Sequence, residues 1–253
     1  MTRVVIDDML ELVNRSVQLD TPPEADVFYL QPDGLGDEWY APPASRVDWE
    51  ENPSDHGAFW PDEWFMSART FPIRGALWTR SSSLGQARAR RMLARLHNRP
   101  LSVMVEDEGG TVWVTGASTQ RPIITRPSIY RVEFTLFITC PDPIKYGREA
   151  RYPATGGSLV VENPGDAPTW PVLYATGPTT VCTVELGDRM VAWHGNAPEG
   201  FRLDPRDGLA IDPHGAVVGR LAVDDVFKVP PGAHTLAAAS DGPLSIGVRG
   251  GWQ

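Results

Sequence analysis

The 253-residue sequence has few cysteines and no long apolar run. Without about 18 consecutive apolar residues it offers no ordinary membrane-spanning helix, so we expect no membrane insertion. Cys140 and Cys182 are too few for a disulfide scaffold and too distant for a paired metal knuckle, so we predict free, buried thiols. Because 32 acidic residues outnumber 23 basic ones, the net charge is −9 and we expect no specific nucleic-acid binding.

Export, catalytic and metal-binding motifs are also missing. Acids at Asp7, Asp8 and Glu11 interrupt the apolar stretch that a secretory signal needs. The five histidines show neither an i, i+4 pair nor a cysteine partner at ligand spacing. No nucleophile elbow, phosphate-binding loop or dinucleotide fingerprint occurs. Asp204, Asp207 and Asp212 lack the spacing of a calcium loop and are interpreted as turn residues. We therefore predict no enzyme, no cofactor and no metal.

The sequence is rich in turn-forming residues, with 24 glycines and 24 prolines, so helices should be scarce. One helix is predicted over residues 82–98. Residues 83–86 have capping-box spacing, and Leu84, Ala87, Leu93 and Leu96 are expected to share its apolar face. Four arginines (Arg88, Arg90, Arg91 and Arg95) are expected on the opposite, solvated face, which can also suit an acidic partner.

Strand patterns surround this helix. Residues 101–105 and 111–115 flank a polar, glycine-bearing loop and predict a hairpin. Residues 131–139 alternate apolar and polar side chains, as a half-buried strand does. A stretch rich in arginine, proline and glycine at 147–157 is interpreted as a linker. We predict an N-terminal β-rich domain with one helix at 1–148 and a second domain at 149–253.

The second domain shows only short strands separated by turn formers, which predicts an antiparallel β-sandwich and a mainly β protein. The nine expected strands are 158–162, 171–175, 181–186, 190–194, 208–211, 217–220, 226–229, 234–238 and 244–249.

An acidic, tryptophan-rich segment at 37–65 departs from this pattern. Eight acids (Asp37, Glu38, Asp48, Glu50, Glu51, Asp55, Asp62 and Glu63) face one arginine, Arg46, so the segment holds seven of the nine net negative charges. It also contains Trp39, Trp49, Trp60 and Trp64. Tryptophan is typical of binding hot spots, so we favour a protein-docking loop with these four residues as interface candidates. A flap over the protein's own core and a ligand site are the alternatives.

The order of several short motifs resembles siphophage distal tail (Dit) proteins along nearly the whole chain. In the first half the motifs are residues 31–36, 56–58, 68–71, 73–75 and 140–147. In the second half they are residues 161–171, 175–178 and 229–234, with a tryptophan near the end at Trp252. Each motif is an ordinary turn or strand sequence, and the resemblance depends on their order and spacing.

This resemblance implies a non-enzymatic virion protein of the tail tip, assembled in the host bacterial cytoplasm. The N-terminal domain is expected to form a homo-oligomeric ring, typically a hexamer, and the C-terminal sandwich to be galectin-like. The implied partners are the tail tube protein, the tail-tip hub or tail-associated protein, host-recognition proteins and the tape-measure protein.

Two other functions remain open at this point. A carbohydrate-binding module would use an aromatic platform, for which Trp170 and Trp193 are candidates, although a tryptophan within a strand is more often part of a core. A glycosidase would need two carboxylates at a set separation, which sequence spacing does not define.

Overall fold

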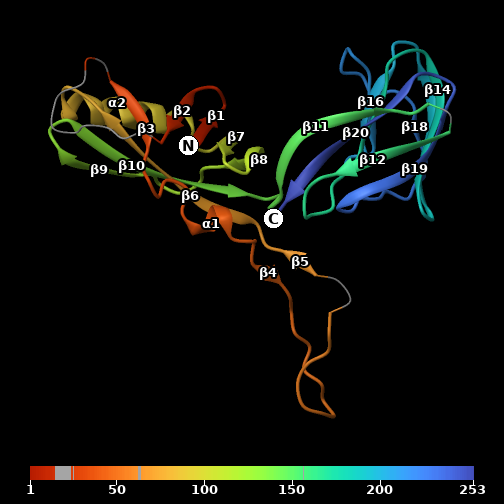
Figure 1. The fold of residues 1–253 in the computed structure, drawn as a ribbon, viewed down its shortest axis with the longest axis horizontal. Coiled ribbons are helices and arrows are strands. Elements are labelled where there is room, and N and C mark those ends of the chain that lie inside the picture. The colour runs from red at the N-terminus through yellow and green to blue at the C-terminus, as the bar shows by residue number, and fades with distance from the viewer. Residues whose placement is uncertain (15–23, 25, 62–63, 156) are drawn as a thin grey trace. The chain divides into compact units, whose positions relative to one another are not determined.

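The computed structural model describes residues 1–14, 24, 26–61, 64–155 and 157–253. It is mainly β, as predicted, and the paired strands run antiparallel (Figure 1). The chain divides into two compact units, Met1–Lys145 together with Gln253, and Tyr146–Trp252. Neither described helix has the length and apolar character needed to span a membrane.

The described residues of unit 1 form ten strands and two helices. The strands are β1 (Arg3–Ile6), β2 (Leu10–Val13), β3 (Val27–Leu30), β4 (Ser45–Arg46), β5 (Phe65–Met66), β6 (Arg69–Trp78), β7 (Pro100–Asp107), β8 (Gly110–Ala117), β9 (Ile123–Ser128) and β10 (Arg131–Cys140). The helices are α1 (Asp37–Tyr40) and α2 (Ser82–Arg95). β10 pairs with both β6 and β9, β6 also pairs with β3, and β7 pairs with β1 and β8.

The main strand pairing of this unit is the long ladder between β6 and β10. It runs without interruption from Arg131 opposite Trp78 to Cys140 opposite Arg69. The predicted alternation of β10 is confirmed, because its apolar residues are buried at every second position. β6 was not predicted, since Pro72 and Gly75 interrupt its pattern. Gly75 lies opposite Phe134, where an added Cβ would stand 2.4 Å from the aromatic ring.

Helix α2 confirms the predicted helix and corrects its details. The N-cap is Ser81, and its side chain makes no capping hydrogen bond, so the predicted capping box does not form. Leu84 is 73% exposed and Ala87 is also exposed, contrary to the expected apolar face. Leu93 and Leu96 are buried as predicted, and they share the buried stripe with Gly85 and Ala89, at spacings of four, four and three residues. The helix packs on β6, β9 and β10.

The predicted hairpin is also present as β7 and β8. Its loop is tighter than expected, because Asp107 already pairs with Gly110. The Asp107 carboxylate accepts a hydrogen bond from the Gly109 amide at 2.8 Å, and Gly110 has a φ of +117°. Such a backbone conformation favours glycine.

Unit 2 is formed by two antiparallel sheets and contains no helix in its described residues. One sheet has the order β17-β16-β13-β20-β11 and the other β12-β19-β14-β15-β18. The strands are β11 (Lys145–Pro153), β12 (Ser158–Asn163), β13 (Val172–Ala175), β14 (Thr179–Leu186), β15 (Arg189–Ala197), β16 (Phe201–Asp204), β17 (Leu209–Ile211), β18 (Arg220–Asp224), β19 (Gly232–Ser240) and β20 (Leu244–Trp252). Both sheets contribute to one apolar core, so the unit is a β-sandwich.

Several predicted boundaries in this region were wrong. The expected linker at 147–157 is largely strand β11, and the two units divide between Lys145 and Tyr146, three residues before the predicted boundary. Phe201–Asp204 was missed, and the segment 226–229 makes only an isolated bridge through Val229. A strand expected at 217–220 lies at Arg220–Asp224 instead. Short strands of mixed polarity carry too weak a periodic signal to locate their ends.

Candidate functional site: an arm with three exposed tryptophans

Residues 45–61 and 64–66 form the described part of a hairpin arm between α1 and β6 (Figure 1). At its root Ser45 pairs with Met66, and near its tip Glu51 bridges to Ala58. The tip turns because the Asn52 side-chain oxygen accepts a hydrogen bond from the Ser54 amide at 3.0 Å. These contacts make the described part of the arm a two-stranded hairpin. Asp62 and Glu63, which belong to the predicted acidic segment, lie outside the described residues.

Three of the predicted tryptophans meet on this arm. Trp49, Trp60 and Trp64 lie with their ring centroids 5.9–6.0 Å apart, mostly edge to face. Their exposed fractions are nevertheless 54%, 79% and 54%. Large exposed apolar patches occur at protein, membrane and ligand contact sites and on aggregation-prone surfaces. We name these three residues the tryptophan cluster.

Trp39, the fourth candidate, is a core residue, and its assignment to an interface was wrong. It is 2% exposed and packs edge to face on Phe71 at 4.8 Å. The Lys145 ammonium lies 5.3 Å from its ring and donates a hydrogen bond to its carbonyl oxygen at 3.2 Å. The difference arises because α1 turns this side chain inward, whereas the other three follow the extended arm.

Arg69 fixes the root of the arm. It is 3% exposed, and its Nη1 donates hydrogen bonds to the carbonyl oxygens of Glu38, Trp39 and Ala41 at 2.9–3.1 Å. Its Nε donates to the Pro143 carbonyl at 3.0 Å. Burial lowers the pKa of this guanidinium, and the carbonyl oxygens compensate part of the lost hydration. The arm thus leaves the unit from a firmly held base.

The tryptophans considered for sugar binding do not form a platform. Trp193 is fully buried, stacks on Phe201 at 4.2 Å between ring centroids and donates a hydrogen bond from Nε1 to Val218. Trp170 is half-buried, and the ammonium of Lys228 lies 5.1 Å from its ring.

The other sequence candidates have structural roles. Both cysteines are free and buried, as predicted, and burial raises the pKa of each thiol to about 12. Asp207 and Asp212 accept hydrogen bonds from backbone amides in their own turns, which confirms their interpretation as turn residues. Within the described residues, no three His, Cys, Asp or Glu side chains are placed to hold a metal ion.

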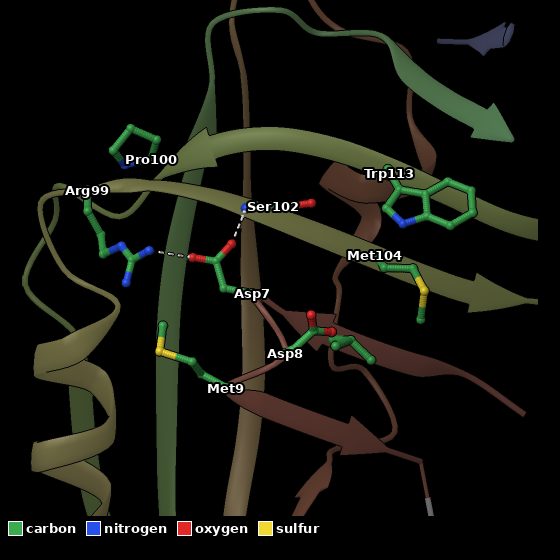
Figure 2. Close-up of a pocket in the computed structure, with 9 residues that line it drawn as sticks. Asp7, Asp8, Met9, Arg99, Pro100, Ser102, Met104 and Trp113 are labelled. Atoms are coloured by element: carbon green, nitrogen blue, oxygen red, sulfur yellow. Dashed lines mark hydrogen bonds and ion pairs between the residues drawn. The ribbon is translucent and has the colours of Figure 1, made fainter. Parts of the chain in front are cut away.

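A hollow of about 460 Å³ lies beside the β1–β2 turn of unit 1 (Figure 2). Asp7 and Asp8 form this turn with φ values of 49° and 54°, a conformation that is uncommon for residues other than glycine. The Asp7 carboxylate accepts a hydrogen bond from the Ser102 amide at 2.7 Å and pairs with Arg99 at 3.0 Å. The Asp7 carboxylate therefore holds the turn against β7.

Comparison with solved structures identifies the fold. The SPP1 Dit (gp 19.1) protein, described as a paradigm of the hub adsorption apparatus in phages that infect Gram-positive bacteria, is similar over 100% of both chains. The TM-score is 0.70 at 14% sequence identity. A chain of the phage P2 baseplate in its activated conformation with Ca matches at a TM-score of 0.54 and 6% identity. That match covers 99% of this chain and 98% of the other. No protein-family model matches, and no curated protein is significantly similar in sequence. The chain therefore has the Dit fold, which confirms the predicted resemblance at the level of structure.

Proposed function

We propose that this chain is a structural protein of a phage tail tip, located in the virion, where unit 1 forms a closed ring of six copies. The ring joins the tail tube to the tail-tip hub and to host-recognition proteins, and no step of this role requires catalysis. The fold shared with the SPP1 Dit protein over the full length of both chains is the observation that carries the proposal.

The tryptophan cluster supports self-assembly. In a ring, each subunit presents one surface to one neighbour and a different surface to the other. An arm that projects from one subunit would therefore contact a different surface of the next subunit. Trp49, Trp60 and Trp64 on a firmly rooted arm provide the apolar part of such a contact. We also propose that unit 2 is galectin-like. The two-sheet sandwich of this unit is compatible with that assignment.

The test is the native mass of the full-length protein by light scattering across concentration, with and without the tail tube protein. We expect a mass six times that of the 27.8 kDa chain, and rings in electron micrographs. A monodisperse monomer under both conditions would contradict the proposal. Selective binding on a glycan array without ring formation would favour a carbohydrate-binding module instead.

A further inference from the structure

The C-terminal half of α2 borders a cavity in unit 1. This cavity of about 650 Å³ lies between the helix and the residues that lead into β9, and we name it the α2 hollow. Its size falls within the range of about 300–1,000 Å³ that is usual for small-molecule sites. Apolar side chains form part of its wall, namely Leu93, Pro122 and Ile124. The hollow therefore has both the room and the apolar surface for the body of an organic molecule.

Two arginines give the same wall positive charge. Arg90 of α2 and Arg121 before β9 line the hollow, and neither has an acidic partner within ion-pair distance among the residues that the structure describes. Arg88, on the same helix, differs because it pairs with Asp26 at 2.8 Å. No described residue that lines the hollow is acidic. The C-terminal end of α2 contributes only about half a negative charge, so the two guanidinium groups outweigh it and the hollow suits an anionic group.

Polar groups at the hollow lack hydrogen-bond partners. His97 lines it, and the Nδ1 atom of this imidazole is buried without a partner in the described part of the chain. Ser118 forms a bridge with His97 and is fully buried, and its Oγ atom is also unpaired there. Buried polar atoms in native structures usually have a partner. An oxygen atom of a bound head group can accept a hydrogen bond from the imidazole and so supply one.

We propose that the α2 hollow binds a small amphiphilic anion, a molecule with a carboxylate or phosphate head group on an apolar chain. The guanidinium groups of Arg90 and Arg121 suit this head group, because each presents a planar fork of donors to carboxylate or phosphate oxygens. The apolar chain lies against the apolar wall of the hollow. This inference goes beyond the proposed function and does not depend on ring formation.

The make-up of the hollow favours a small ligand over a nucleic acid. A nucleic-acid backbone is bound by many exposed cations and needs no apolar wall. Three other exposed arginines, Arg91, Arg95 and Arg126, are not among the residues that line the hollow. The net charge of −9 also opposes binding of a long polyanion. An amphiphile, in contrast, uses the charged and the apolar parts of the wall together.

Isothermal titration calorimetry of the full-length protein with octanoate tests both parts of the site. We expect one octanoate to bind per chain. Octanol has the same chain without the charge and should bind about 100-fold more weakly, because it loses the charge-assisted hydrogen bonds. Hexanoate is two methylene groups shorter and should bind about 10-fold more weakly, because each buried methylene group adds to the affinity. Octyl phosphate identifies the head group: tighter binding than octanoate assigns a phosphate, and weaker binding assigns a carboxylate.

A pair of matched variants locates the ligand. Arg90→Gln with Arg121→Gln removes both guanidinium groups and should raise the dissociation constant of octanoate by about 100-fold. Arg91→Gln with Arg95→Gln makes the same change in net charge on α2 outside the hollow. At about 150 mM NaCl this control should change the dissociation constant by less than about threefold, because salt screens the more distant charges. All four side chains are exposed, so both variants should unfold at the temperature of the unmodified protein.

Three results would overturn the proposal. They are an absence of octanoate binding, an unchanged affinity in the variant with Arg90→Gln and Arg121→Gln, and binding of octanol as tight as that of octanoate. The second result would place the ligand elsewhere, for example on the tryptophan cluster. Duplex DNA that binds through all four arginines, in a protein that does not bind octanoate, would assign this surface to a nucleic acid instead. The native mass tests the ring separately, so failure of one proposal is distinguishable from failure of the other.

Discussion

Asp204 shows how single side chains stabilise unit 2. It is 4% exposed and accepts hydrogen bonds from Arg206 Nε and Nη2 at 3.0 and 2.7 Å and from Arg202 at 3.1 Å. Burial alone raises the pKa of this carboxyl, but the hydrogen bonds and charges of Arg206 and Arg202 outweigh it, so its pKa lies below the ordinary value. The two arginines therefore hold the carboxylate in its charged form.

The stability of the protein should depend on this group in acid. Because the pKa of Asp204 is lower in the folded state, its contribution is complete above about pH 4 and is lost as the pH falls through the folded pKa. We expect Asp204→Asn to lower the free energy of unfolding at pH 7 by about 1–3 kcal/mol and to flatten its pH dependence below pH 4. Urea unfolding at pH 7 and in acid measures both effects. Asp188→Asn, on an exposed turn, should stay within about 0.5 kcal/mol of the unmodified protein, and an unchanged acid slope in Asp204→Asn would contradict the assignment.

Asn163 and Gly165 make contacts with distant residues that their short sequence motif does not reveal. The Asn163 amide nitrogen donates to the carbonyl oxygens of Ala167 and Val229, and its oxygen accepts from the amides of Gly165 and Gly251. A Cβ on Gly165 would stand 1.8 Å from the Gly251 carbonyl oxygen. A sequence that looks like an ordinary turn thus joins three distant segments of unit 2.

At the scale of elements, we expect substitutions on the arm to affect assembly much more than the stability of the fold. Trp60 is 79% exposed and contributes little to the core, although it contacts Trp49 and Trp64. Under the proposed function, we expect Trp60→Ser to change the free energy of unfolding by less than about 1 kcal/mol. The same substitution should weaken assembly by about 2 kcal/mol or more per contact, because buried tryptophans dominate interfaces.

Paired measurements of unfolding and native mass distinguish these effects. Val217→Ser removes a side chain that is 59% exposed on unit 2 and serves as the matched control, with neither quantity expected to change. A Trp60→Ser protein that keeps both its stability and its full native mass would show that the tryptophan cluster is not an assembly contact.

At the scale of the whole molecule, each unit has its own apolar core. Leu136 is a fully buried residue of unit 1, and Leu203 is its counterpart in unit 2. We expect two unfolding transitions, one for each unit. Leu136→Ala should lower the free energy of unfolding of unit 1 by about 2–5 kcal/mol, and Leu203→Ala should lower that of unit 2 by a similar amount. Differential scanning calorimetry resolves the transitions. A single transition lowered equally by both substitutions would show that the units unfold together.

The amino-acid sequence alone determined the features that depend on local periodicity and composition. The buried alternation of β10, the position of α2, the β7–β8 hairpin and the absence of helices from the described residues of unit 2 follow from spacings that one segment contains by itself. The order of short motifs along the chain likewise indicated the Dit fold. The residues of the tryptophan cluster were predicted as interface candidates, together with Trp39, because a segment so rich in tryptophan is unusual at any position in a fold.

The tertiary structure decided the features that depend on contacts between distant residues. Trp39 and Trp49 are ten positions apart and equally apolar, yet only Trp39 meets Phe71 and Lys145. Leu84 and Gly85 are adjacent, and glycine is the buried one because Thr79 packs closely against it. The side chains that surround a residue come from segments far away in the chain, so local sequence cannot specify which residues a fold buries and which it leaves for a partner.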